Sequence, residues 1–212
     1  MKVELIAITR YLRGEGTPEE LLEHAGRICY RSESRGEPGK FIQARVREGH
    51  ESIIEHANAS FEISGISRAC SHQLVRHRLA SYSQESQRYV EMTDPAWALP
   101  PDILENDEAM EIWKGFAGEV TGAYEALREL GIKKEDARFA LPNGAATRII
   151  VTMNFRELLH FFRIRISRAA QWEIRDVGVR MLELVYAQAP SVFADIRSDL
   201  MERYPEFFEG IG

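Results

Sequence analysis

A β-branched run at residues 148–153 (RIIVTM) is the feature that most constrains the fold of this chain. Such side chains favour strands, because they pack well on a pleated surface. The breaker Leu141–Gly144 (LPNG) comes shortly before the run, and a stretch with helical periodicity, 155–164, follows it. Strand patterns also occur at 3–8 and, as an alternation of apolar and polar residues, at 57–63. The chain must therefore combine strands with helices.

Helix signals are most complete around Thr17. Thr17 can cap a helix, Pro18 suits its first turn, and Glu20 completes a capping box, so a helix is predicted to run to about Tyr30. Further helices are predicted over 41–47, 67–77, 105–130, 133–140, 155–164 and 170–187, with a turn over 32–39 and no assigned element over 81–87. The pattern predicts an α+β fold (mixed α/β): a single domain over residues 1–212, with a central, largely antiparallel sheet flanked by long helices.

Composition argues against several classes of protein. The net charge of -6 argues against a protein that binds nucleic acid over its whole surface, because such binding relies on a broad positive field. The longest apolar stretches are too short for a membrane span, and the first residues do not resemble a signal peptide. Cys29 and Cys70 provide neither a disulfide framework nor a cluster at metal-ligand spacing. We therefore expect a cytoplasmic protein with no bound metal and with no nucleic-acid or membrane partner.

The basic residues are unevenly divided between types, because 22 are Arg and 5 are Lys. Codon usage is one explanation. The other is that several arginines face phosphates or carboxylates in the forked geometry that Lys cannot reproduce.

The run Arg76–Tyr89 concentrates hydrogen-bond donors. It holds three arginines, one histidine, three serines and two glutamines, with only Glu85 to neutralise them. Further donors lie upstream at Arg68, His72 and Gln73. The run indicates an anion site that could also bond a base edge through Gln84 and Gln87. A solvated polar loop is the plainer interpretation, and single-stranded RNA binding by stacking tyrosines is another.

The spacing within this run is specific. Six residues match all the fixed positions of the signature of flavin-dependent thymidylate synthases: Arg76, His77, Arg78, Ser81, Ser86 and Arg88. The chain also resembles that family over 49–56, 141–143, 147–154 and 171–175. The resemblance covers most of the chain.

The resemblance implies a methyltransferase that converts dUMP to dTMP, with 5,10-methylenetetrahydrofolate as one-carbon donor and FAD, reduced by NADPH, as hydride source. It also implies a homotetramer with active sites shared between subunits. The positions that match flavin-binding residues are Ser52, Arg76, His77, Arg78, Gln84, Asn154, Phe155, Arg156 and His160. Those that match dUMP-binding residues are Gln73, Leu74, Val75, Arg76, Gln84, Glu85, Ser86, Gln87, Arg88, Arg138 and Arg165.

Arg165 matches the arginine proposed to act on the pyrimidine, and is the expected catalytic residue. Its guanidinium stays charged, so it cannot be an ordinary general base, but it can stabilise negative charge developing on the ring. Ser86 is interpreted as a ligand-binding residue, because a serine nucleophile needs an adjacent base. Glu135 is expected either to orient Arg138 across one helical turn or to form a plain surface pair.

Other interpretations stay open. By its apolar surroundings His160 would be a core histidine, whereas the resemblance makes it a flavin contact. The whole chain could be a non-catalytic nucleotide- or RNA-binding module that uses the same arginines. A nucleotide phosphatase would need a metal or an activated nucleophile.

Overall fold

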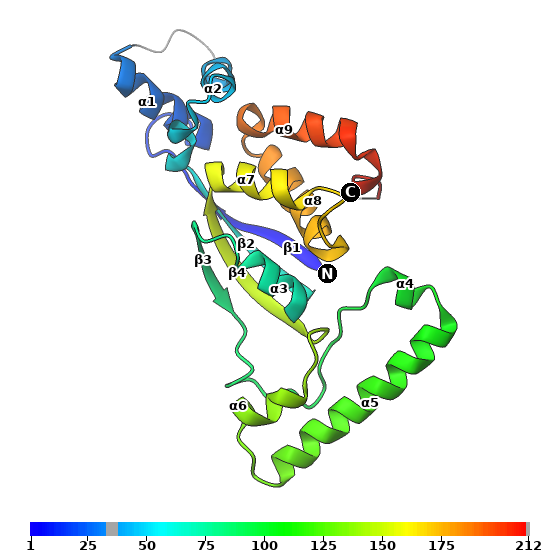
Figure 1. Ribbon diagram of the computed structural model, residues 1–212. Coiled ribbons are helices and arrows are strands. Elements are labelled where there is room, and N and C mark those ends of the chain that lie inside the picture. The colour runs from blue at the N-terminus through cyan, green and yellow to red at the C-terminus, as the bar shows by residue number, and fades with distance from the viewer. Residues whose placement is uncertain (33–37, 211–212) are drawn as a thin grey trace. The chain divides into compact units, whose positions relative to one another are not determined.

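The sheet is confirmed as largely antiparallel. The computed structural model describes residues 1–32 and 38–210, apart from the side chain of Tyr30, so most of the turn predicted over 32–39 lies outside the described residues. The strands are β1 (Lys2–Ile8), β2 (Asn58–Ser67), β3 (Ala80–Gln84) and β4 (Ala146–Asn154), in the order β1-β2-β4-β3 (Figure 1). The amide of Arg68 donates to Ala145 and that of Phe155 to Ala57, so β2 and β4 run in opposite directions.

Helices supply most of the remaining regular structure, which confirms the α+β class. The α-helices are α1 (Pro18–Tyr30), α2 (Pro38–Arg47), α3 (Arg68–Leu74), α4 (Pro101–Leu104), α5 (Asp107–Glu129), α6 (Lys134–Ala137), α7 (Phe155–Arg165), α8 (Trp172–Tyr186) and α9 (Pro190–Arg203). Short 3-10 turns are η1 (Glu51–His56), η2 (Arg138–Ala140) and η3 (Pro205–Phe207). Helix α1 has the predicted capping box, in which Thr17 and Glu20 bond each other's backbone amides.

The residues group into two compact units. Unit 1 comprises Met1–Lys2, Ile63–Leu74 and Ser83–Ile149, and unit 2 comprises Val3–Glu62, Val75–Tyr82 and Ile150–Gly212. The single domain expected over the whole chain stays a prediction.

Unit 2 is built around aromatic packing between its C-terminal helices. Helices α7, α8 and α9 pack against one another (Figure 1). Phe193 of α9 lies edge-on to Phe155 and Phe162 of α7, with ring centroids 5.1 and 6.0 Å away. All three rings are fully buried. This packing holds α7 in place, and α7 carries many of the predicted site residues.

Unit 1 has a smaller core at the C-terminal end of α5. Met92, Tyr124 and Ala137 are buried together, with Leu127 and Leu141 packed against them. The Tyr124 hydroxyl accepts a hydrogen bond from the Met92 amide at 3.2 Å. This cluster ties the loop after β3 to the segment that carries Arg138.

Several elements differ from the sequence prediction, among them α3, β3 and α9. The helix predicted over 67–77 ends at Leu74, because the chain turns and the carbonyl of His77 accepts a hydrogen bond from the Tyr82 hydroxyl at 2.7 Å. Strand β3 was not predicted, since it is a polar edge strand whose alternate residues are exposed. Helix α9 was not predicted either, although Pro190 begins it and a buried face follows.

No helix within the described residues combines the length and the apolar character needed to cross a bilayer.

Phe193→Ala is expected to lower the free energy of unfolding by about 3–5 kcal/mol, because it leaves a cavity beside α7. Ile112→Ala on α5 is the control: this side chain is 75% exposed, so its loss is expected to cost no more than about 0.5 kcal/mol. Urea denaturation measures both, and equal losses would contradict the packing described here.

Candidate functional site

The junction between β4 and α7 positions the first group of site residues. The strand ends at Asn154 and the helix begins at the next residue. The Asn154 side chain caps the helix by accepting from the Glu157 amide at 2.8 Å. With the start of the helix fixed, its buried face carries Phe155, Leu158, Leu159, Phe161 and Phe162. Glu157 is a buried carboxylate on this apolar face.

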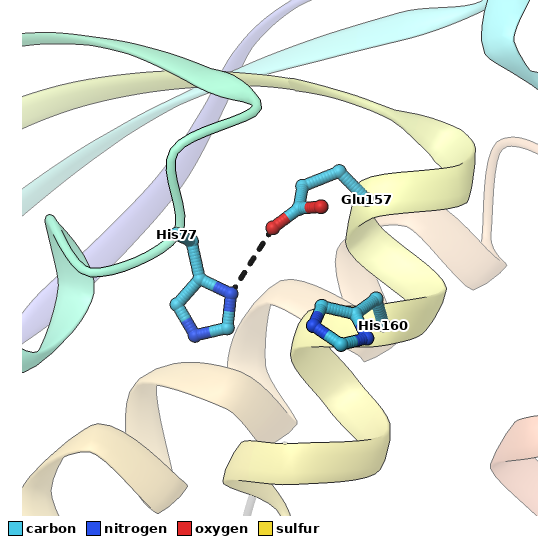
Figure 2. Close-up of side chains that lie close together, drawn as sticks. All are labelled: His77, Glu157 and His160. Atoms are coloured by element: carbon cyan, nitrogen blue, oxygen red, sulfur yellow. Dashed lines mark hydrogen bonds and ion pairs between the residues drawn. The ribbon is translucent and has the colours of Figure 1, made fainter.

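Glu157 is satisfied by His77, which comes from the loop between α3 and β3 (Figure 2). The Nδ1 atom of His77 lies 3.1 Å from Oε1 of Glu157, and each residue is only 6% exposed. On the other edge of the ring, Nε of Arg165 donates to Nε2 of His77 at 3.0 Å. Phe161 lies edge-on to the imidazole, with ring centroids 4.9 Å apart. The histidine is therefore held between an acid and a guanidinium.

Burial lowers the pKa of His77 below the usual histidine value, because the charged form loses its hydration. The hydrogen bond to Glu157 opposes this shift, whereas the charge of Arg165 and the nearby His160 reinforce it. Burial and then the charge of Glu157 raise the pKa of Tyr82 to about 12, so this hydroxyl stays protonated and donates to the His77 carbonyl. The site thus favours a neutral imidazole.

Two adjoining cavities open beside this group. The larger, about 520 Å³, is lined by Glu51, Glu55, Leu79, Asn154, Arg156, Glu157, His160 and Arg163. The smaller, about 380 Å³, is lined by Arg76, His77, Arg78, Leu79, Glu157, His160, Ile164 and Arg165. Their shared residues make one continuous concave surface in unit 2. His160 is exposed on it, which excludes the interpretation of His160 as a core histidine.

The charges around this surface are unevenly paired. On one side Arg156 and Arg163 both form ion pairs with Glu51, and Arg156 pairs with Glu55 as well. On the other, Arg76 and Arg78 are exposed and have no hydrogen bond or ion pair to any residue that the structure describes. Free guanidiniums beside a cavity are suited to an anionic ligand.

A second group of predicted residues lies in unit 1, around a cavity of about 390 Å³. Its polar lining comes from Arg68, His72, Gln87, Arg138 and Asn143, with no carboxylate among the described lining residues. Burial and then the charge of Arg138 lower the pKa of Arg68, a sign that the two cations are close and unneutralised. The electrostatics of this cavity are suited to an anionic ligand.

Near this cavity several predicted ligand residues already have protein partners. Both amide hydrogens of Gln84 are used, at 2.9 Å to Ser71 and 3.2 Å to Thr147, so Gln84 can meet a ligand only through its carbonyl oxygen. The Ser86 hydroxyl accepts from the Arg88 amide at 3.3 Å.

The expectation that the Glu135 carboxylate orients Arg138 is wrong. That carboxylate pairs with Arg88 at 3.1 Å, and Arg138 instead donates to the backbone carbonyl of Glu135. Arg138 follows α6 directly as the first residue of η2, and it reaches Glu135 through the backbone carbonyl because the carboxylate is paired with Arg88.

Comparison with known proteins gives a consistent result. The family model described as "Thymidylate synthase complementing protein" matches residues 9–191. A flavin-dependent thymidylate synthase of Geobacter sulfurreducens is 44% identical over 189 residues, which cover 84% of this chain and 82% of the relative. The chain belongs to the flavin-dependent thymidylate synthase family.

Two further relatives with the same name show how the match varies in extent. The one from Nitratidesulfovibrio vulgaris is 40% identical over 215 residues, covering 91% of this chain and 85% of the relative. The one from Pyrococcus furiosus is 47% identical over 154 residues, which cover 71% of this chain and 63% of the relative. The resemblance inferred from the run Arg76–Arg88 is thereby confirmed at the level of the family.

The family-matched residues fall into two groups, one in each unit, and the side chains of some of them do not reach a cavity. Gln73, Gln84, Gln87, Arg88 and Arg138 belong to unit 1, whereas the flavin-matched residues other than Gln84, together with Arg165, belong to unit 2. The side chains of Leu74 and Phe155 are fully buried, so only their backbones could meet a ligand. Ser52 lies on η1 but does not line the adjoining cavity, which its neighbours Glu51 and Glu55 do.

Sequence reasoning missed Glu157 and did not place Arg68 among the ligand residues. Glu157 could have been found from the sequence: it lies three residues after Asn154, the residue that caps α7, and falls on the apolar face of that helix. The proximity of Arg68 to Arg138 has no such signal, because it depends on how the start of α3 and the start of η2, far apart in sequence, meet in the fold.

The residues His77, Glu157 and His160 also offer ligand atoms within 4.8 Å of one another, a grouping that sequence spacing did not reveal. The geometry does not favour a metal ion here. The Nε2 lone pair of His77 is used by a guanidinium, and Nδ1 faces the only carboxylate. A cation at Nε2 would have to displace Arg165, and a cation at Nδ1 would have to displace the hydrogen that faces Glu157 while lying near the positive charge of Arg165.

The lowered pKa of His77 predicts that stability falls in acid. The unfolded histidine has its ordinary pKa of 6.5 and binds a proton more readily than the folded one. This contribution to stability is therefore complete above pH 6.5 and is lost as the pH falls through the lower folded pKa. Urea denaturation at about pH 5 to 8 should show the advantage of the wild type over His77→Gln shrinking in acid. If the free energies of unfolding of the wild type and of His77→Gln changed in parallel with pH, this prediction would be wrong.

Proposed function

We propose that this chain is a thymidylate synthase that methylates dUMP to dTMP, with 5,10-methylenetetrahydrofolate as one-carbon donor, FAD as cofactor and NADPH as reductant. The observation that carries the proposal is the position of Arg165. It is held by a neutral histidine beside a cavity that also carries two unpaired arginines, in a chain of this family.

FAD fits the concave surface of unit 2. The unpaired guanidiniums of Arg76 and Arg78 suit its pyrophosphate, while His160 and the amide of Asn154 present polar edges to the cavity. Bound and reduced, FAD supplies the hydride that completes the methyl group. Arg156 lies at the same surface but must share its charge with Glu51 and Glu55.

The nucleotide phosphate fits the cavity lined by Arg68 and Arg138. A dianion there would neutralise two guanidiniums that have no carboxylate in the cavity lining, with Gln87 and His72 as further polar contacts. The role proposed for Arg165 is on the pyrimidine itself, where its fixed positive charge would stabilise negative charge on the ring and make the carbon to be methylated more nucleophilic. The Ser86 hydroxyl accepts from a backbone amide, which is not a base that could activate it as a nucleophile. We therefore assign Ser86 to binding the ligand.

The proposal includes an oligomeric state and a cellular location. The enzyme is a homotetramer in which dUMP and FAD sites draw residues from more than one subunit, and it works in the cytoplasm with both cysteines, Cys29 and Cys70, free. Nothing in the comparisons supports a non-catalytic nucleotide- or RNA-binding module.

The central test is a dUMP methylation assay with FAD, NADPH and methylenetetrahydrofolate, omitting each component in turn. We expect a yellow protein whose flavin absorbance bleaches with NADPH, and dTMP formation that needs every component. Arg165→Ala should bind FAD normally and lose about 100- to 1,000-fold in turnover, the usual effect of removing one donor from a developing charge. Protein that cannot be reconstituted with FAD would refute the proposal.

The phosphate site is tested by comparing dUMP with deoxyuridine, which lacks the phosphate. Arg138→Ala should weaken dUMP binding by about 10- to 100-fold, the effect of losing a charge-assisted hydrogen bond, and should leave deoxyuridine binding nearly unchanged. Arg128→Ala is the control, because this arginine pairs with Glu91 and does not line the cavity. Calorimetry measures all the affinities. Equal losses for both ligands would place the phosphate elsewhere.

A further inference from the structure

Arg165 and Glu157 together determine which nitrogen of His77 carries the proton. The Nε of an arginine has one hydrogen and cannot accept, so the 3.0 Å contact makes Nε2 of His77 the acceptor. A ring nitrogen that accepts is unprotonated, and in the neutral imidazole the hydrogen must then be on Nδ1. Nδ1 faces Oε1 of Glu157 at 3.1 Å, where a donor is required. The two hydrogen bonds together admit only the neutral Nδ1–H form.

The surroundings favour this form and keep the ring in place. His77 and Glu157 are each 6% exposed, so water has little access to the bond between them. The groups that face the ring are Glu157, Arg165 and His160, all from α7, with Phe161 edge-on to it. From β3, the Tyr82 hydroxyl bonds the backbone carbonyl of His77. The ring is thus held from two elements.

The bond from Nε also fixes the guanidinium of Arg165. This group is planar and rigid, so holding Nε–H in a defined direction restricts where its terminal nitrogens can lie. Four of the five donors are on those two terminal nitrogens. The direction in which these donors point therefore depends on His77 presenting a lone pair and not a hydrogen.

We propose that Glu157 is a positioning residue: by accepting from Nδ1–H it selects the tautomer of His77 that holds Arg165 in its working orientation. An apolar residue at position 157 would leave Nδ1–H without an acceptor in a buried place, which favours moving the hydrogen to Nε2. Two donors would then face each other, and Arg165 would turn away. Only the effect on turnover rests on the proposed function; the tautomer is a property of the ligand-free chain.

The first measurement is spectroscopic. Nitrogen-15 NMR of ligand-free protein labelled in its histidine rings, near neutral pH, reports which ring nitrogen carries hydrogen, and the His77 signals are those missing from His77→Gln. We expect Nδ1–H in the wild type and in Glu157→Gln, which keeps an acceptor oxygen. Glu157→Leu, which keeps the volume but not the acceptor, should show a mixture of tautomers.

The second measurement is kinetic. Glu157→Leu should lower kcat about 100-fold, the scale expected when a catalytic group is misplaced by about 1 Å, with a much smaller change in the KM for dUMP. Glu157→Gln should restore most of the turnover. Glu23→Leu is the matched control: Glu23 is also 6% exposed and pairs with Arg27 on α1. It should lose stability without changing the tautomer or kcat.

The outcomes separate this inference from the proposed function. A wild-type His77 with hydrogen on Nε2, or a Glu157→Leu protein with normal tautomer and kcat, overturns the inference. Nδ1–H in a wild type that does not methylate dUMP supports the tautomer assignment and refutes the function. If Glu157→Leu does not fold, the wild-type spectrum still decides: Nδ1–H supports the inference and Nε2–H overturns it.

Discussion

The direct passage from β4 into α7 is the constraint on which the candidate site depends. No loop separates the two elements, so the cap made by Asn154 and the bond from the Phe155 amide to Ala57 fix where the helix starts and how it is rotated. That rotation turns the phenylalanines toward α9 and places Glu157 among them. A buried carboxylate must find a donor, and His77 is that donor. Packing, capping and the chemistry of the site are thus consequences of one junction.

The arginines serve two different physical purposes. Those paired with carboxylates, such as Arg156 with Glu55 and Arg47 with Asp195, tie elements of unit 2 together at exposed positions where each pair contributes little. Those beside the cavities, such as Arg76 and Arg68, lie where no carboxylate of the lining neutralises them, which is the arrangement a protein of net charge -6 needs to bind anions locally. The excess of Arg over Lys is consistent with both purposes, since each uses the forked donor geometry.

Local signals predicted most of the fold, and contacts between distant segments account for the rest. The capping box at Thr17 and the β-branched run in β4 were sufficient to place α1 and the central strand. Strand β3 escaped prediction because an edge strand needs no apolar alternation, and the early end of α3 depends on a tyrosine that comes later in the chain. The family signature predicted that His77 matters. It did not indicate Glu157, because the link between them spans 80 residues and is made by the tertiary fold.

The cavity lined by Arg68 and Arg138 has a consequence for the chain as a whole. Two cations share a cavity without a counter-ion in its lining, so the ligand-free fold retains a repulsion that an anion removes. An anion that binds only the folded chain shifts the unfolding equilibrium by mass action, by roughly 2.7 kcal/mol at 100 times its dissociation constant. An anion bound in this cavity would therefore make the resistance of the protein to unfolding depend on the concentration of that anion as well as on the sequence.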